Sequence, residues 1–114
     1  MYYILNCRFD IHDTYLYQYE IEKETEKCIF YCEKYKTKIK NKIIEFKEKR
    51  RVIKDKLNHI NIRSDKEGTA WCEIYVVTYS KPEDVQAGIE EIKRLRTEYL
   101  NRLANQKMEI ERGD

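Results

Sequence analysis

The stretch TAWCEIYVVTY, residues 69–79, constrains the fold most, because it is highly apolar in a chain that is 39% charged. Its side chains alternate between two largely apolar faces. One face holds Ala70, Cys72, Ile74 and Val76, and the other holds Trp71, Tyr75, Val77 and Tyr79. A strand that is apolar on both faces is typical of the interior of a sheet. We therefore predict a central strand here.

Two more strands are predicted near the N-terminus. Residues 2–9 alternate between two faces, of which the one holding Tyr3, Leu5, Cys7 and Phe9 is the more apolar. The next four residues, DIHD, suit a turn because Asp side chains bond to nearby backbone N–H groups. In residues 14–22 the side chains of Tyr15, Tyr17, Tyr19 and Ile21 then share a face. We expect these two strands to form a hairpin.

A long helix is predicted from about residue 23 to residue 59. Apolar residues recur there every seven positions, with others at the adjoining i+4 positions; the first set is Cys32, Ile39, Phe46, Ile53 and Ile60, and the second is Ile29, Ile43 and Leu57. Lysines alternate in YKTKIKNKI as they would along a strand, but a strand would place Phe46 and Ile53 on opposite faces. The longer pattern favours a helix, with a break near Thr37 and Asn41.

A second long helix is predicted after the apolar strand. Ser80 suits an N-cap, Pro82 the first turn, and an amphipathic pattern continues to about residue 111. The order is ββαβα: one α+β domain over residues 1–114, with a small antiparallel three-stranded sheet and two long amphipathic helices. The first helix would be roughly 50 Å long, which exceeds what so short a chain can cover. We therefore expect a homodimer.

Positive charge is concentrated in one segment. The whole chain carries +2, whereas residues 34–56 carry eleven Lys or Arg against three acids. On a helix these bases are the solvated remainder around the apolar stripe, and they would bind phosphates only where a neighbour gathers them. The nucleic-acid hypothesis assigns phosphate contacts to Lys36, Lys40, Lys47, Arg50, Arg51 and Lys54, and stacking to Tyr15, Tyr17 and Tyr19. The tyrosine row is equally typical of a core or a dimer interface.

No catalytic signature is present. The three glycines are too far apart for a phosphate-binding loop, and His12, between two Asp residues, is typical of a turn histidine. Cys7, Cys28, Cys32 and Cys72 lack the paired spacing of a zinc site. We expect no metal, no cofactor and no enzymatic activity. A Cys7–Cys72 disulfide is predicted on the condition that the first and third strands are neighbours.

Composition and character suggest a source and a function. Lys/Glu enrichment is typical of hyperthermophiles, although an AT-rich mesophile genome gives a similar bias. The Lys/Glu/Ile/Tyr-rich composition, the length and the opening MYYILNCRF resemble small accessory proteins of rod-shaped and filamentous viruses of hyperthermophilic archaea. That resemblance implies the host cytoplasm and a role in host interaction, defence inhibition or genome handling. We expect no membrane span, and we favour a non-enzymatic protein that binds a host or viral protein, with nucleic-acid binding as the alternative.

Overall fold

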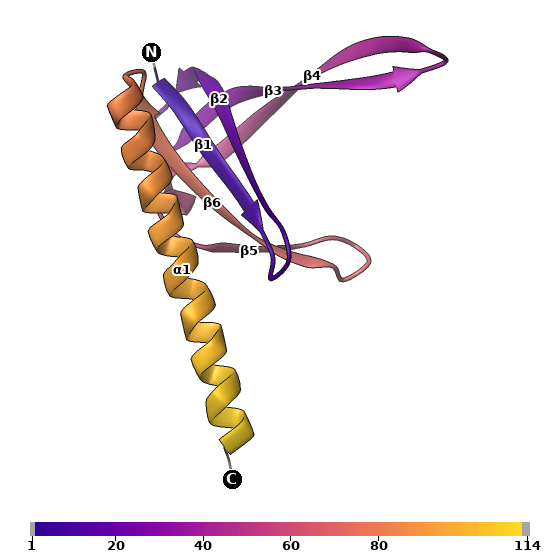
Figure 1. The fold of residues 1–114 in the computed structure, drawn as a ribbon. Coiled ribbons are helices and arrows are strands. Elements are labelled where there is room, and N and C mark those ends of the chain that lie inside the picture. The colour runs from indigo at the N-terminus through magenta and orange to yellow at the C-terminus, as the bar shows by residue number, and fades with distance from the viewer. Residues whose placement is uncertain (1, 113–114) are drawn as a thin grey trace.

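The computed structural model describes the backbone of residues 2–112 and the side chains of residues 2–106. It is a six-stranded antiparallel sheet with one C-terminal helix (Figure 1), so the predicted three-stranded sheet with two long helices is wrong. The strand order is β4-β3-β2-β1-β6-β5. The strands are β1 (Tyr2–Phe9), β2 (Thr14–Glu24), β3 (Cys28–Ile39), β4 (Lys42–Ile53), β5 (Asn61–Ser64) and β6 (Ala70–Tyr79).

Helix α1 (Pro82–Arg112) covers one face of the sheet through an apolar core. This core combines one face of β1 with one face of β6 and the helix residue Ile92; the strand residues are Leu5, Cys7, Phe9, Cys72, Ile74 and Val76. A Cβ built on Gly88 would lie 2.5 Å from Thr78 Cγ2, so the absence of a side chain there lets the helix approach the sheet. The strand predicted over residues 69–79 and its two faces are confirmed, with the observed strand starting at Ala70. The helix begins at Pro82, and Lys81 rather than Ser80 accepts its first backbone hydrogen bonds.

A second core lies on the other face of the sheet, because β2 changes partner along its length. Residues 14–20 of β2 pair with β1, whereas Ile21, Lys23 and Glu24 pair with β3, and the register shifts between Ile21 and Lys23. An irregularity of this kind bends the strand and increases its twist. The base of β3 and β4 therefore turns back over β1 and β6, where five side chains form the second core: Ile4, Ile29, Tyr31, Val52 and Tyr75.

The predicted helix 23–59 is wrong, because this segment forms the β3–β4 hairpin. Lys40 and Asn41 have positive φ angles of 50° and 65°, as a two-residue type I′ turn requires, and Asn tolerates that region. A repeat of seven residues is odd, so in a strand its members fall alternately on the two faces. Phe46 and Ile53 do lie on opposite faces, as a strand demands. Strand β5 lies where only a turn was predicted.

The β3–β4 hairpin and the helix both extend beyond the body of the protein (Figure 1). The Cα radius of gyration is 17.0 Å, against about 13 Å for a compact domain of roughly this length. We call residues 33–48 the arm. The second core includes Tyr31 of β3 and Val52 of β4 but no residue of the arm between them. Among the helices of the described residues none is long and apolar enough to cross a membrane.

Candidate functional site

The face of the sheet that the helix leaves open carries a cluster of arginine and aromatic side chains. Strand pairing sets Arg8 of β1 between Tyr15 of β2 and Glu73 of β6. In the same way Arg63 of β5 lies opposite Trp71 of β6. Directly paired residues share a face of the sheet. The antiparallel register therefore gathers these five side chains on one surface.

Glu73 is the centre of this surface, and it is only 3% exposed. Trp71 Nε1 donates a hydrogen bond of 2.9 Å to Oε1, and the hydroxyl of Tyr75 donates to Oε2. Arg8 Nε lies 3.1 Å from Oε1, and Arg63 Nε lies 3.9 Å from Oε2. Burial and the bond to Glu73 both raise the pKa of Tyr75, so its proton stays in place. Since a buried charge needs partners, Glu73 is held by two arginines and two aromatic donors.

The hollow around Glu73 has an excess of positive charge. It has a volume of about 450 Å³. Its lining comprises five bases, Arg8, Lys49, Arg50, Arg51 and Arg63, one acid, Glu73, and the aromatic residues Tyr31, Trp71 and Tyr75. Five bases against one acid leave +4 among the lining residues, and Arg50 is also paired with Glu33 and Glu48 outside the lining. The buried Nε atoms of Arg8 and Arg63 have no hydrogen-bond partner, which means that their contacts with Glu73 are ion pairs without hydrogen-bond geometry.

A second hollow of about 230 Å³ continues this one, and Arg8 and Trp71 line both. Tyr15 and Tyr17 form its aromatic side, with 54% and 39% of their surfaces exposed. Asp10 and Asp13 also line it. Backbone N–H groups of Asp13 and His12 bond to the Asp10 carboxylate and lower its pKa, so it stays ionised. We call the two hollows together the groove; it is basic in the first hollow and acidic at the far limit of the second.

The residues assigned by sequence to nucleic-acid binding fall on separate surfaces. Tyr15, Tyr17 and Tyr19 do share one face of β2, and Tyr19 stacks on Tyr31 with ring centroids 5.1 Å apart. The six bases assigned to phosphate contacts lie in different places. Arg50 and Arg51 line the groove, whereas Lys36 and Lys47 lie on one face of the arm. Lys40 is in the hairpin turn, and Lys54 forms an ion pair of 3.0 Å with Glu24. The structure therefore brings two of the six bases to the tyrosine surface.

Four residues that build the groove were not predicted from the sequence: Arg8, Arg63, Trp71 and Glu73. A signal was present, because Glu73 is a carboxylate inside the most apolar strand and Arg8 interrupts the first strand. Buried acids in such positions are normally paired with bases. The pairing itself depends on the register between β1 and β6, which no local pattern gives.

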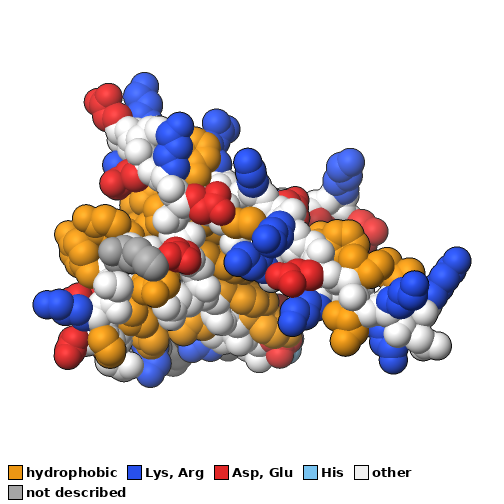
Figure 2. All heavy atoms as spheres, turned by 90° about the horizontal axis from the view of Figure 1, so that it is seen from above, with side chains coloured by type: hydrophobic (Ala, Val, Ile, Leu, Met, Phe, Trp, Pro, Cys, Tyr) orange, Lys and Arg blue, Asp and Glu red, His pale blue; other side chains and the backbone are white. Residues whose placement is uncertain are grey.

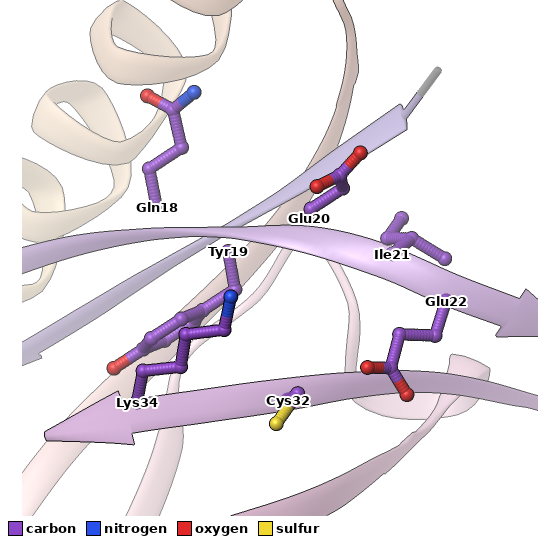
Figure 3. Close-up of a pocket in the computed structure, with 7 residues that line it drawn as sticks. All are labelled: Gln18, Tyr19, Glu20, Ile21, Glu22, Cys32 and Lys34. Carbon is purple, nitrogen blue, oxygen red and sulfur yellow. The ribbon is translucent and has the colours of Figure 1, made fainter. Parts of the chain in front are cut away.

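Another hollow, of about 560 Å³, has a different character. It opens between β2 and β3 beyond their short ladder, and Figure 3 shows the Glu22 side chain extending from β2 toward β3, which carries Cys32 and Lys34. Two acids, Glu20 and Glu22, one base, Lys34, and the Cys32 thiol line it, so this hollow has a net charge of −1 and no excess of positive charge. His12 is exposed in the turn after β1, and no group of three or more metal-ligating side chains occurs among the described residues.

All four cysteines are free thiols. The condition set for a Cys7–Cys72 disulfide is met, because β1 and β6 are neighbours. Cys7 lies opposite Ile74, however, and Cys72 lies opposite Phe9, so the two cysteines are diagonal partners. Diagonal positions are roughly 7–8 Å apart, beyond the usual Cα separation in a disulfide of about 4.4–6.8 Å. The disulfide remains a prediction that a thiol assay tests.

Comparisons of this chain with protein-family models, with curated proteins and with solved structures found no match.

Proposed function

We propose that the protein binds single-stranded nucleic acid in the groove. The observation that carries the proposal is the hollow around Glu73, where five bases and three aromatic residues meet around a single acid. Arginine forks pair with phosphate oxygens, and the side chains of Arg8 and Arg63 stay 43% and 41% exposed beside Glu73. The net +4 of the lining favours phosphate over any neutral ligand.

The aromatic side chains favour unpaired bases over duplex. Tyr15, Tyr17 and Trp71 lie in the groove beside Arg8, and exposed rings bind nucleic acid mainly by stacking on bases that are free of a helix. Two adjoining hollows of about 450 and 230 Å³ are nucleotide-sized and too small for a duplex. In this arrangement the phosphates contact Arg8, Arg63 and Lys49, while Arg50 keeps its ion pairs with Glu33 and Glu48. The bases extend toward the tyrosines.

Trp71 is the only tryptophan in the chain and lines both hollows, so its fluorescence reports on the groove alone. We expect an oligothymidine of twelve nucleotides to quench it, with weaker quenching by a duplex of the same length. For three phosphate contacts to a single strand, the slope of log K against log salt is about −2. The measurement is a fluorescence titration at several salt concentrations.

Two variants define the surface. The double change Arg63→Ala with Lys49→Ala removes two bases from the lining, and we expect the salt slope to become shallower by about one unit. Arg94→Ala is the matched control, because Arg94 is a helix residue that pairs with Glu91 and Glu98 away from the groove. No quenching, or an equal loss in the control and the groove variant, would contradict the proposal.

The expectation that the protein binds another protein is favoured by a different surface. The arm exposes apolar side chains on one face (Figure 2, where the arm extends to the right). That surface is independent of the groove.

A further inference from the structure

The two faces of the arm differ in chemistry, because residues paired across β3 and β4 alternate between them. One face, which we call the lysine face, carries Lys34, Lys36, Lys38, Ile43, Glu45 and Lys47. The other, which we call the apolar face, carries Tyr35, Thr37, Ile39, Lys42, Ile44 and Phe46. Tyr35 and Phe46 stack there with ring centroids 5.4 Å apart.

The apolar face is continuous with the second core but is left uncovered. Tyr31 and Val52, on the same face of the hairpin nearer the body, are buried against β1 and β6. Farther out, Tyr35 and Ile39 are each 47% exposed, and Ile44 and Phe46 are each 38% exposed. Contiguous exposed apolar surface on an extended hairpin is typical of a protein interface. The question is which partner it fits.

The order of charges along this face is complementary to itself. Four pairs follow one another from the body to the tip: Glu33 with Glu48, Tyr35 with Phe46, Thr37 with Ile44, and Ile39 with Lys42. Arg50 forms ion pairs of 2.9 Å with Glu33 and 3.0 Å with Glu48. One guanidinium against two carboxylates leaves −1 at the base of the arm, and Lys42 places +1 at its tip.

We propose that a second copy of this chain covers the apolar face, with the two arms packed face to face and antiparallel. A two-fold axis between the second and third pairs sets Tyr35 and Phe46 of one copy on Thr37 and Ile44 of the other. The same axis brings Lys42 to the acidic base of the partner copy's arm. Such an isologous contact uses one patch twice, and both lysine faces stay outside in water.

The interface is small, so the dimer is expected to be weak. Four pairs on one face extend about 20 Å along the arm. A patch of this length on a two-stranded hairpin buries less than the roughly 800 Å² per partner of a standard interface. We expect dissociation constants on the order of micromolar, measured by sedimentation equilibrium of the full chain.

Two neighbouring isoleucines separate this inference from general stickiness. Ile44→Glu places a charge in the proposed contact and is expected to weaken dimerisation at least tenfold. Ile43→Glu is the control, since Ile43 is 75% exposed on the lysine face, and it should leave the dimer intact. Circular dichroism establishes that each variant is folded. A wild-type chain that stays monomeric at about 100 μM would overturn the proposal. Equal effects of the two changes would also overturn it, and they are the result expected if the copies pair through the edge of β4 instead.

Charge exchange tests the antiparallel arrangement. Lys42→Glu should dissociate the dimer, and adding Glu48→Lys should restore it. Lys42 and Glu48 lie six residues apart on β4, about 20 Å in a strand, so a zero-length carbodiimide cross-link between them forms only between copies. Peptide mapping of cross-linked dimer should find Lys42 joined to Glu33 or Glu48. A dimer that lacks this cross-link, or that Lys42→Glu does not weaken, would refute the arrangement.

Discussion

At the scale of single residues, we expect Glu73 to affect both the stability of the fold and the proposed nucleic-acid binding. Glu73→Gln preserves the shape of the side chain but removes the only acid in the lining of a hollow with five bases. Arg8 and Arg63 then lose their ion-pair partner, and we expect the free energy of unfolding to fall by about 1–3 kcal/mol. Urea denaturation, followed through Trp71 fluorescence, measures this loss.

The same change should strengthen nucleic-acid binding, because a negative charge near the phosphates is gone. We expect affinity for oligothymidine to rise about three- to tenfold at low salt. A stability loss without a gain in affinity would place the phosphates elsewhere. Glu45→Gln, on the lysine face of the arm, is the control for a change of net charge alone.

The cysteines give a second prediction at this scale. Cys7 and Cys72 are buried, whereas Cys28 and Cys32 are partly exposed. Burial raises the pKa of Cys7 from 9.0 to about 11, so the folded state favours the neutral thiol. The stabilisation is complete below pH 9 and is lost as the pH rises through 11, because only the unfolded thiol ionises in between. Cys7→Ala should make unfolding less dependent on pH between 9 and 11.

A thiol reagent at pH 8 completes this test. We expect two thiols to react quickly and all four to react in denaturant. If only two react in denaturant, and reduction restores the other two, Cys7 and Cys72 form the predicted disulfide after all.

At the scale of elements, the sequence predicted those segments whose pattern is unambiguous. The alternation in residues 2–9 and 70–79 and the start of the last helix match the structure. The β3–β4 hairpin was missed because Ile39, Phe46 and Ile53 satisfy a seven-residue repeat while their neighbours alternate. The two positive φ angles at Lys40 and Asn41 decide the matter. Lys-Asn is a weaker turn signal than Asn-Gly, so the local sequence did not reveal it.

The candidate site was less predictable than the strands. The shared face of Tyr15 and Tyr17 follows from alternation alone. The meeting of Arg8, Glu73 and Arg63 requires the order β1-β6-β5, and Arg50 reaches the groove only because β2 changes partner and turns the hairpin back. Arg8 and Glu73 are more than sixty residues apart in the sequence. Their pairing therefore cannot be predicted from the periodicity of either strand alone.

At the scale of the whole molecule, the arm and the body are separable. Buried core residues lie outside residues 33–48, so the arm adds little to the stability of the body. Glu33 and Glu48 are six pairs from Ile39 and Lys42 along the ladder. Because hydrogen-bonded and non-hydrogen-bonded pairs alternate, the two pairs are of the same kind. An Asn-Gly turn that replaces residues 34–47 therefore closes the shortened hairpin in the existing register.

We expect this shortened protein to fold, to stay monomeric and to keep the groove. Its circular dichroism and Trp71 emission should match those of the full chain, since Lys49, Arg50 and Arg51 remain on the shortened β4. Sedimentation equilibrium should show one copy at concentrations where the full chain dimerises. Oligothymidine should still quench Trp71 with a salt slope within about half a unit of the original, because the groove supplies the phosphate contacts. If quenching disappears while the body stays folded, the lysine face of the arm, and not the groove, binds the nucleic acid.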